Sequence, residues 1–284
     1  MNIEKMVAEA LVEDLGPGDL TTEACVPGDL FGKAHVRAKE DLVVCGNILA
    51  PSIFDGVSRR YGGTVSYSVQ IPDGEFAKNG DVVAVVEGPL RNLIIGERLA
   101  LNWMMKLSGI ATNVHRWVSA ANGSGLRVVD TRKTTPLVRE YEKYAVRCGG
   151  GFNHRMGLYD GVMIKDNHIT AVGSIDAAVS VVRRSVHHLI KIEVEVSNEE
   201  QLVTAIDAGA DVILLDNMNN ERLRRCVELA RSKSPTVILE ASGNMNPERI
   251  TAIKDIGLDV ISAGGLIHQA TWVDLSMKIV SRVS

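Results

Sequence analysis

Six short apolar segments, separated by segments with helical periodicity, constrain the fold of this chain more than any other feature. The segments are rich in β-branched residues and apolar on both faces, as expected for parallel strands covered by helices. They lie at residues 126–132, 161–167, 190–197, 211–217, 236–242 and 259–265. Repeated β–α units form a parallel sheet, open or closed. Six strands are fewer than a complete (β/α)8 barrel has, so we expect an α/β barrel-like domain, with an open doubly wound sheet as the alternative.

The N-terminal part of the chain has a different pattern. Residues 33–90 alternate between apolar and polar positions and contain turn-forming Pro, Gly and Asn, which is typical of strands joined by turns. Amphipathic periodicity predicts a helix over residues 1–15, which ends at Gly16. The same periodicity predicts two further helices, at residues 93–107 and 112–121.

These patterns predict two domains. A mostly β N-terminal domain comprises residues 1–110, and an α/β barrel-like catalytic domain comprises residues 111–284. We expect the C-terminal segment, residues 270–284, to form a helix that packs back on the N-terminal domain.

Composition excludes several classes of protein. The chain has 284 residues, a net charge of −4 and a pI of about 6.0, so no global basic field favours nucleic acid or an anionic membrane. No segment approaches the roughly 18 apolar residues of a membrane-spanning helix, and the N-terminus has no apolar core typical of a signal peptide. The four cysteines form no C-x-x-C pair that would indicate zinc or redox chemistry. We therefore expect a soluble cytoplasmic protein.

Each of the six apolar segments ends in polar or glycine residues. In barrels and open parallel sheets alike, the carboxyl ends of the strands surround one mouth. Acids also lie within or directly after apolar segments, as in 192–196 and 212–216. A buried carboxylate is costly unless it is paired or bound to a metal. The pattern therefore predicts a polar binding site at this mouth.

Cations gather on one side of the predicted mouth. Between Arg127 and Lys165 the cations outnumber the acids, although the whole chain is acidic. Arg139 and Lys143 lie four residues apart on a predicted helix, 136–145, and are interpreted as a solvated face. The remaining candidates for an anion site are Arg132, Lys133, His154, Arg155 and Lys165.

The opposite side of the mouth has features of a phosphate site. Ser242 and Gly243 precede a predicted helix that starts near Pro247, and Gly264 and Gly265 precede another. Exposed backbone N–H groups at such positions bind phosphate. A site with several cations, carboxylates and a phosphate-binding loop suits a polyanionic substrate, with Mg²⁺ bridging phosphate oxygens to acids such as Glu195 and Asp216.

Several motifs together resemble the quinolinate phosphoribosyltransferase family. The most specific is "DTRKTTPLVREYEKYAVRCGGGFNHRMGLYDGVMIKDNH"; "GERLALNWMMKLSGIAT", "IEVEVSNEEQL" and "ISAGGLIH" support it. The resemblance implies an N-terminal α+β sandwich-like domain followed by an incomplete six- to seven-stranded α/β barrel. It implies the conversion of quinolinate and phosphoribosyl pyrophosphate to nicotinate mononucleotide, pyrophosphate and CO₂, with Mg²⁺, in NAD biosynthesis.

The resemblance also implies a role for each candidate residue. Arg132 and Arg155 would bind the two carboxylates of quinolinate, with help from His154. Lys133 and Lys165 would neutralise the pyrophosphate. Glu195 and Asp216 would hold the ribose hydroxyls and Mg²⁺. The residues expected to bind the 5′-phosphate are Ser242, Gly243, Gly264 and His268.

The resemblance further implies a homodimer, or a higher homo-oligomer, in which Arg98 reaches the active site of the other subunit. From its sequence context alone, Arg98 is better interpreted as a helix-surface residue paired with an acid.

Three alternatives remain open at this stage. The first is a paralogous group associated with molybdenum transport operons, which has an uncertain substrate. The second is a barrel that acts on a different sugar phosphate. The third is a biotinyl or lipoyl carrier, because the alternation of residues 72–88 resembles a carrier hairpin; Lys78 is the only lysine there, and no Met-Lys motif surrounds it.

Overall fold

The structure of the protein, a computed structural model, describes residues 3–283. The chain divides into two compact units, each of which is described separately. Unit 1 is formed by Met1–His115, Thr135–Gly150 and Ala270–Ser284, and unit 2 by Arg116–Thr134 and Gly151–Gln269. Both units are built from segments that are distant in the sequence, so the single boundary predicted near residue 110 is replaced by several chain crossings.

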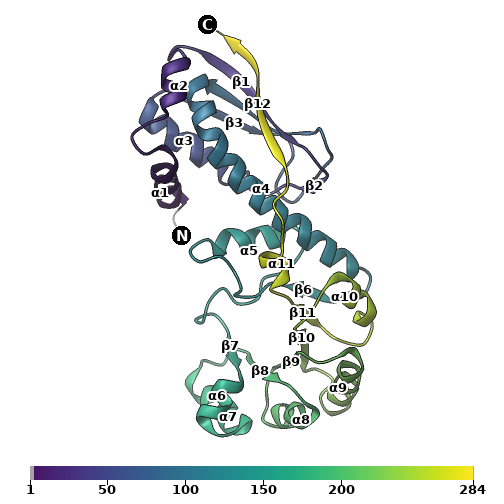
Figure 1. Ribbon diagram of the computed structural model, residues 1–284. Helices are drawn as coiled ribbons and strands as arrows, with labels where there is room; N and C mark the ends of the chain where they lie inside the picture. The colour runs from purple at the N-terminus through teal and green to yellow at the C-terminus, as the bar shows by residue number, and fades with distance from the viewer. Residues whose placement is uncertain (1–2, 284) are drawn as a thin grey trace. The chain divides into compact units, whose positions relative to one another are not determined.

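Unit 1 contains a four-stranded antiparallel sheet in the order β12-β1-β5-β3 (Figure 1). Its strands are β12 (Leu275–Val283), β1 (Phe31–Ala38), β5 (Val82–Pro89) and β3 (Ser66–Val69), and a separate pair is formed by β2 (Leu42–Val43) and β4 (Phe76–Ala77). The helices α1 (Ile3–Leu15), α2 (Leu20–Cys25) and α3 (Ala50–Tyr61) belong to the same unit, and α1 packs on α3. The predicted β-rich N-terminal region and its first helix are confirmed, apart from residues 1–2, which lie outside the described residues.

The C-terminal segment is a strand, so the prediction of a helix at 270–284 is wrong. β12 pairs with β1 from Phe31↔Val283 to Ala38↔Leu275 and runs beside it in Figure 1. Leu275 and Met277 are buried whereas Lys278 is exposed. The pairing satisfies backbone groups that an edge strand would otherwise leave open. The expectation that this segment packs on the N-terminal domain is confirmed through strand pairing; Ser284 lies outside the described residues.

A single helix, α4 (Leu90–Ala120), replaces the two predicted at 93–107 and 112–121. Gly109 lies in the gap between the two predicted helices, and glycine generally weakens helices. Its role is instead steric: a Cβ built at Gly109 would lie 2.1 Å from the carbonyl oxygen of Thr271. The glycine therefore allows the chain that leads into β12 to cross the helix closely.

The helix predicted at 136–145 is α5 (Arg139–Cys148), and its predicted solvated face is wrong at one position. Lys143 is fully buried, as is its neighbour Glu142. Glu142 accepts hydrogen bonds from the backbone N–H and the hydroxyl of Thr135 and forms an ion pair with Lys106 at 2.8 Å. Charge alternation alone could not reveal that this helix face packs inside unit 1.

Unit 2 contains the six predicted strands in one parallel sheet, in the order β6-β11-β10-β9-β8-β7 (Figure 1). They are β6 (Arg127–Val129), β7 (Val162–Ile164), β8 (Ile192–Val196), β9 (Val212–Asp216), β10 (Ile238–Ser242) and β11 (Val260–Ser262). Because β6 and β7 form the two edges, the sheet is an incomplete α/β barrel, as expected.

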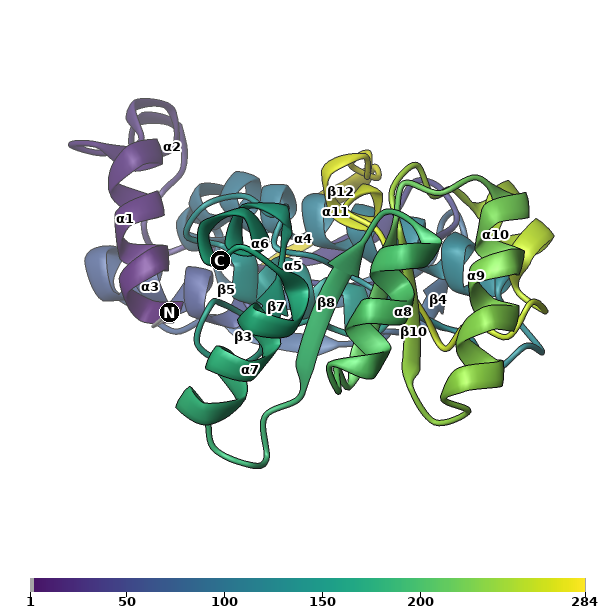
Figure 2. The same ribbon diagram turned by 90° about the horizontal axis from the view of Figure 1, so that it is seen from below.

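Helices follow the strands of unit 2. They are α6 (Asp166–Val172), α7 (Ile175–Ser185), α8 (Glu199–Asp207), α9 (Asn220–Lys233), α10 (Pro247–Ile253) and α11 (Gly265–His268). Figure 2 shows α8, α9 and α10 beside strands β8 and β10. Side-chain caps begin two of these helices: Asn198 accepts from Gln201 N and Asn246 from Arg249 N, each at 2.8 Å. Within residues 3–283, no helix combines the length and the apolar character needed to cross a membrane.

Replacing Gly109 by alanine should destabilise unit 1. Alanine has a higher helix propensity by about 1 kcal/mol, but its methyl group would collide with the Thr271 carbonyl, and overpacking of this kind costs about 1–3 kcal/mol. We expect Gly109→Ala to lower the free energy of unfolding in urea titrations. Ser119→Ala, at an exposed position of the same helix, should leave it nearly unchanged. A Gly109→Ala protein as stable as this control would contradict the steric role.

Candidate active site

A cavity of about 290 Å³ opens at the carboxyl ends of the strands of unit 2. Its volume lies near the lower end of the range for small-molecule sites. The residues that line it are Thr131, Arg132, Lys133, His154, Arg155, Met163, Lys165, Glu195, Leu214, Asp216, Ser242 and Ser262. Eight of the twelve residues assigned to the site from the sequence are in this list.

Strand register explains why these side chains meet. Glu195 is aligned with Leu214, and Leu214 with Glu240. One pleat further along, Asp216 is aligned with Ser242. Since alternate residues of a strand point to the same face, successive layers of side chains point toward the cavity. The polar ends of the apolar segments are therefore brought together by pairing, as predicted.

The segment that carries His154 and Arg155 is attached to the end of β6. Phe152 bridges to Val129, its N–H donates to Val128 O at 2.9 Å, and its carbonyl accepts from Asp130 N at 3.1 Å. Asp130 is fully buried and accepts from Asn153 Nδ2 at 2.7 Å and from His154 N at 2.8 Å. Asp130 was not among the predicted site residues, yet it fixes the backbone that carries two of them.

Arg132 and Arg155 line the same cavity and lie close enough for their charges to interact. One guanidinium N–H group of Arg155 donates to Gly161 O at 2.9 Å. Burial, and then the positive charge of nearby Arg132, lower the pKa of Arg155. Two cations that approach each other in a partly buried cavity are unfavourable in the absence of an anion, so this region is suited to bind carboxylates.

The two lysines lie near carboxylate and glycine residues. Lys165 forms a close ion pair with Glu195. The stem of Lys133 packs on Gly264, where a Cβ would lie 2.7 Å from Lys133 Cδ and 3.0 Å from His268 Nε2. Gly264 and His268 do not line the cavity themselves, but they lie directly against a residue that does. The lining therefore combines four Lys or Arg cations with two carboxylates, a positive balance that favours a polyanion.

The loops after β9 and β10 are locked to one another. Arg249 donates to Gly243 O at 2.8 Å and to Asn244 O at 3.3 Å, and it also contacts Met218 O. Gly243 has a φ of +88°, and a Cβ there would lie 2.1 Å from Asn217 Oδ1. No sequence pattern indicated that Arg249 organises the predicted phosphate loop, because it occupies an ordinary position on α10.

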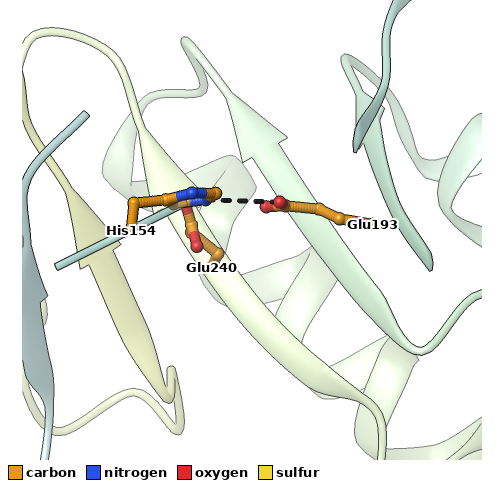
Figure 3. Close-up of side chains that lie close together, drawn as sticks. All are labelled: His154, Glu193 and Glu240. Atoms are coloured by element: carbon orange, nitrogen blue, oxygen red, sulfur yellow. Dashed lines mark ion pairs between the residues drawn. The ribbon is translucent and has the colours of Figure 1, made fainter. Parts of the chain in front are cut away.

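Two buried acids, Glu193 and Glu240, lie beside His154 of the cavity lining and were not assigned from the sequence. His154 Nε2 is 3.3 Å from Glu193 Oε2 and 3.7 Å from Glu240 Oε1 (Figure 3). Glu193 is 6% exposed and Glu240 is 3% exposed. Among the described residues, this trio is the set whose histidine and carboxylate atoms, all within 4.8 Å of one another, have the geometry to hold a cation. The available signal was the position of both acids inside apolar segments.

The surroundings of Glu240 favour its neutral form. Burial, followed by the charge of Glu193, raises the pKa of Glu240 from 4.5 to about 7, while His154 opposes the shift. One carboxylate of the buried pair therefore holds a proton over much of the range up to neutral pH.

Comparison with known proteins identifies the family. The model of the quinolinate phosphoribosyl transferase C-terminal domain matches residues 110–278, and that of the N-terminal domain matches residues 19–108. The chain belongs to the quinolinate phosphoribosyl transferase family.

Curated members of this family cover nearly the whole chain. It is 42% identical over 278 residues to a probable nicotinate-nucleotide pyrophosphorylase [carboxylating] of Synechocystis, which covers 98% of this chain and 92% of the relative. It is 40% identical over 279 residues to the protein of the same name in Bacillus subtilis, with 98% and 94% coverage.

Solved structures agree with this assignment. The crystal structure of NadC from Streptococcus pyogenes superposes with a TM-score of 0.91 at 36% identity, covering 99% of this chain and 96% of that one. The nicotinate-nucleotide pyrophosphorylase from Francisella tularensis gives a TM-score of 0.91 at 34% identity, covering 98% and 95%. The six-stranded parallel unit and the antiparallel N-terminal sheet are thus a family architecture.

Arg98, which the resemblance to the family places in the active site, belongs to unit 1, whereas the cavity belongs to unit 2. Arg98 is exposed on α4, in the part of that helix that belongs to unit 1. Every residue that lines the cavity belongs to unit 2. The expected role of Arg98 in the site of another subunit therefore remains a prediction.

The raised pKa of Glu240 predicts how stability depends on pH. Because the folded state holds this proton more tightly than the unfolded state does, the free energy of unfolding should fall as pH rises from about 4.5 to about 7. Glu240→Gln removes this titration, so the variant should gain stability relative to the wild type as pH rises. Urea unfolding at about pH 5 and about pH 8 checks the sign. An equal difference at both pH values would contradict the assignment.

Proposed function

We propose that this chain transfers the phosphoribosyl group of phosphoribosyl pyrophosphate to quinolinate and releases CO₂, giving nicotinate mononucleotide and pyrophosphate for NAD biosynthesis. The observation that carries the proposal is the pair of close guanidinium groups, Arg132 and Arg155, in one cavity with two lysines and two carboxylates. Family membership and the names of the relatives support the same reaction.

Quinolinate carries two adjacent carboxylates on a flat ring. Arg132 and Arg155 each offer a planar fork of N–H donors, which matches a carboxylate better than an ammonium group does. The bond from Arg155 to Gly161 O holds one edge of its guanidinium and orients the remaining donors. His154 completes this end of the cavity. Binding here would place the ring nitrogen as the nucleophile.

The phosphoribosyl end of the site lies at the carboxylates and the glycine loops. Glu195 and Asp216 would hold the ribose hydroxyls and stabilise positive charge that develops at the anomeric carbon as the pyrophosphate departs, as carboxylates do in glycoside hydrolysis. Lys133 and Lys165 would neutralise charge on the departing group. The loops that carry Ser242, Gly243, Gly264 and His268 would bind the 5′-phosphate through backbone N–H and side-chain donors.

Decarboxylation requires no further cofactor. Once the ring nitrogen is bonded to the ribose, the ring is a cationic pyridinium. The bond to the carboxylate beside the nitrogen can then break, CO₂ leaves, and the electron pair remains on a ring carbon next to the positive nitrogen. That carbon takes up a proton, and the second carboxylate is retained.

The residues present suit Mg²⁺. This hard cation takes oxygen ligands and is usually held by one or two carboxylates together with substrate phosphates. Glu195 and Asp216 both offer carboxylate oxygens to the cavity, whereas the buried trio includes a histidine and is therefore less suited to Mg²⁺. When bound, Mg²⁺ would supply positive charge to the pyrophosphate. Glu195 also contacts Lys165, so a lysine ammonium already neutralises part of its charge.

The assembly and location are part of the proposal. We propose a homodimer, or a larger homo-oligomer built from such dimers. In each dimer, Arg98 of one subunit completes the quinolinate site of the other. The cytoplasm suits the four free cysteines, Cys25, Cys45, Cys148 and Cys226, because a reducing compartment keeps such thiols unpaired.

The reaction is tested by offering phosphoribosyl pyrophosphate and Mg²⁺ with either quinolinate or nicotinate and following nicotinate mononucleotide and CO₂. We expect turnover with quinolinate alone. Turnover with nicotinate, or with neither acid in folded protein, would overturn the proposal. The second outcome would favour the paralogous group with another anionic substrate.

Arg132→Lys should separate carboxylate recognition from folding. The variant keeps the charge but loses the planar fork, so we expect KM for quinolinate to rise about 10- to 100-fold, as loss of a charge-assisted hydrogen bond does. KM for phosphoribosyl pyrophosphate should change little. Arg184→Lys, on the exposed surface of α7, is the matched control and should behave as wild type. Equal changes in both KM values would argue against the assigned role.

Subunit mixing tests the shared site. Arg98→Ala and Arg155→Ala should each be nearly inactive alone. If Arg98 acts in the partner's site, random reassociation of the two variants restores one intact site in half of the dimers, or about one quarter of wild-type activity. Mixing two preparations of the same variant is the control. No recovery after confirmed subunit exchange would place Arg98 in its own subunit's site or outside it.

A further inference from the structure

Glu193 and Glu240, which lie against His154, have no role in the reaction as described above. The two acids come from β8 and β10, which are separated in the sheet by β9. Both converge on one imidazole nitrogen, as Figure 3 shows. One oxygen of each acid, Glu193 Oε1 and Glu240 Oε1, is buried without a hydrogen-bond partner. Buried carboxylates in this state are costly, so their presence calls for a function.

The other imidazole nitrogen identifies the proton arrangement. Arg155 N–H donates to His154 Nδ1 at 2.7 Å. An accepting Nδ1 carries no proton, so a neutral ring must carry its proton on Nε2. His154 Nε2 lies 3.3 Å from Glu193 Oε2 and 3.7 Å from Glu240 Oε1, so a proton on Nε2 faces the two acids. Both nitrogens of the ring are thereby engaged by groups of the protein.

We propose that Glu193 and Glu240 are positioning residues that act through His154 on the quinolinate-binding arginine, Arg155. The acids hold the imidazole in its Nε2–H form, and its Nδ1 then accepts from the backbone of Arg155. Asp130 fixes the same segment from the other side, through His154 N. The backbone at the base of Arg155 is thus held at two successive N–H groups.

This role deepens the proposed function and rests on it, because it assumes that Arg155 binds a quinolinate carboxylate. It assigns the two acids no contact with substrate: neither Glu193 nor Glu240 lines the cavity, whereas His154 and Arg155 do. The acids therefore influence the binding of the dicarboxylate and not the binding of the phosphoribosyl group.

Pairs of similar-sized variants test the role. Glu193→Met and Glu240→Met remove the acceptor, whereas Glu193→Gln and Glu240→Gln keep an amide oxygen that can accept from Nε2–H. We expect Glu193→Met to raise KM for quinolinate about tenfold, the size of one lost hydrogen bond. KM for phosphoribosyl pyrophosphate should stay within about twofold, and Glu193→Gln should recover most of the loss. The variants of Glu240 should follow the same pattern more weakly, because its contact is longer.

Two acids that bind the backbone next to Glu193 and Glu240 provide matched controls. Asp211 accepts from Ile192 N, beside Glu193, and Asp259 accepts from Leu239 N, beside Glu240, each at 2.8 Å. Asp211→Asn and Asp259→Asn should leave both KM values unchanged. If they raise KM for quinolinate as Glu193→Met does, general loosening of the strands explains the effect and the positioning role is overturned.

A double-variant cycle tests whether the acids act through His154. His154→Ala combined with Glu193→Met should raise KM for quinolinate no further than His154→Ala alone, because the shared path is already broken. Multiplied effects would overturn the proposal.

The tautomer of His154 can be measured without any substitution of the acids. Histidine ¹⁵N NMR of the wild-type protein, assigned with His154→Gln, should show an unprotonated Nδ1 and a protonated Nε2. A protonated Nδ1, or a metal ion on Nε2, would overturn the proposal even if every variant failed to fold. Failure of the wild type to turn over quinolinate would instead overturn the proposed function, while this substrate-free measurement would still decide the arrangement of the trio.

Discussion

The in-register pairing of six parallel strands is the constraint on which the site depends. Pairing aligns Glu195, Leu214 and Glu240 across three strands, and Asp216 with Ser242 one pleat further along. A slip of one residue in any strand would turn its polar residues away from the cavity and its apolar residues into it. The same hydrogen bonds that hold the sheet together therefore also set the chemistry of the mouth, and no loop has to place the carboxylates.

The cationic residues of the site are positioned in a different way. Arg132 and Lys133 follow β6 directly, but His154 and Arg155 come from a segment outside the helices and strands. That segment is fixed by the pairing of Phe152 with β6 and by Asp130, whose buried carboxylate accepts two hydrogen bonds from it. A carboxylate that is buried with donors on both oxygens is a strong local constraint, so a segment without regular structure can present an arginine accurately.

Opposite charges in the site are arranged in layers. At the level of the cavity, cations outnumber carboxylates, and the excess suits a substrate with several negative charges. Below that level, Glu193 and Glu240 lie with His154 in a buried environment where one carboxylate favours its neutral form. Acids beneath a cationic surface moderate the repulsion between the arginines while leaving their N–H donors free for substrate. A bound polyanion would complete this charge balance.

The sequence by itself determined the six parallel strands, the barrel-like arrangement and most residues of the cavity, because apolar periodicity and the position of polar residues at strand ends are local properties. Tertiary structure decided the rest. The C-terminal segment is a strand because β1 offers an unpaired edge, and α4 continues through Gly109 because another backbone crosses it there. Lys143 is buried by packing that its own helix does not encode. The trio beneath the site exists only because β8 and β10 bring two distant acids to one imidazole, and such convergence of residues far apart in the chain leaves no periodic signal in the sequence.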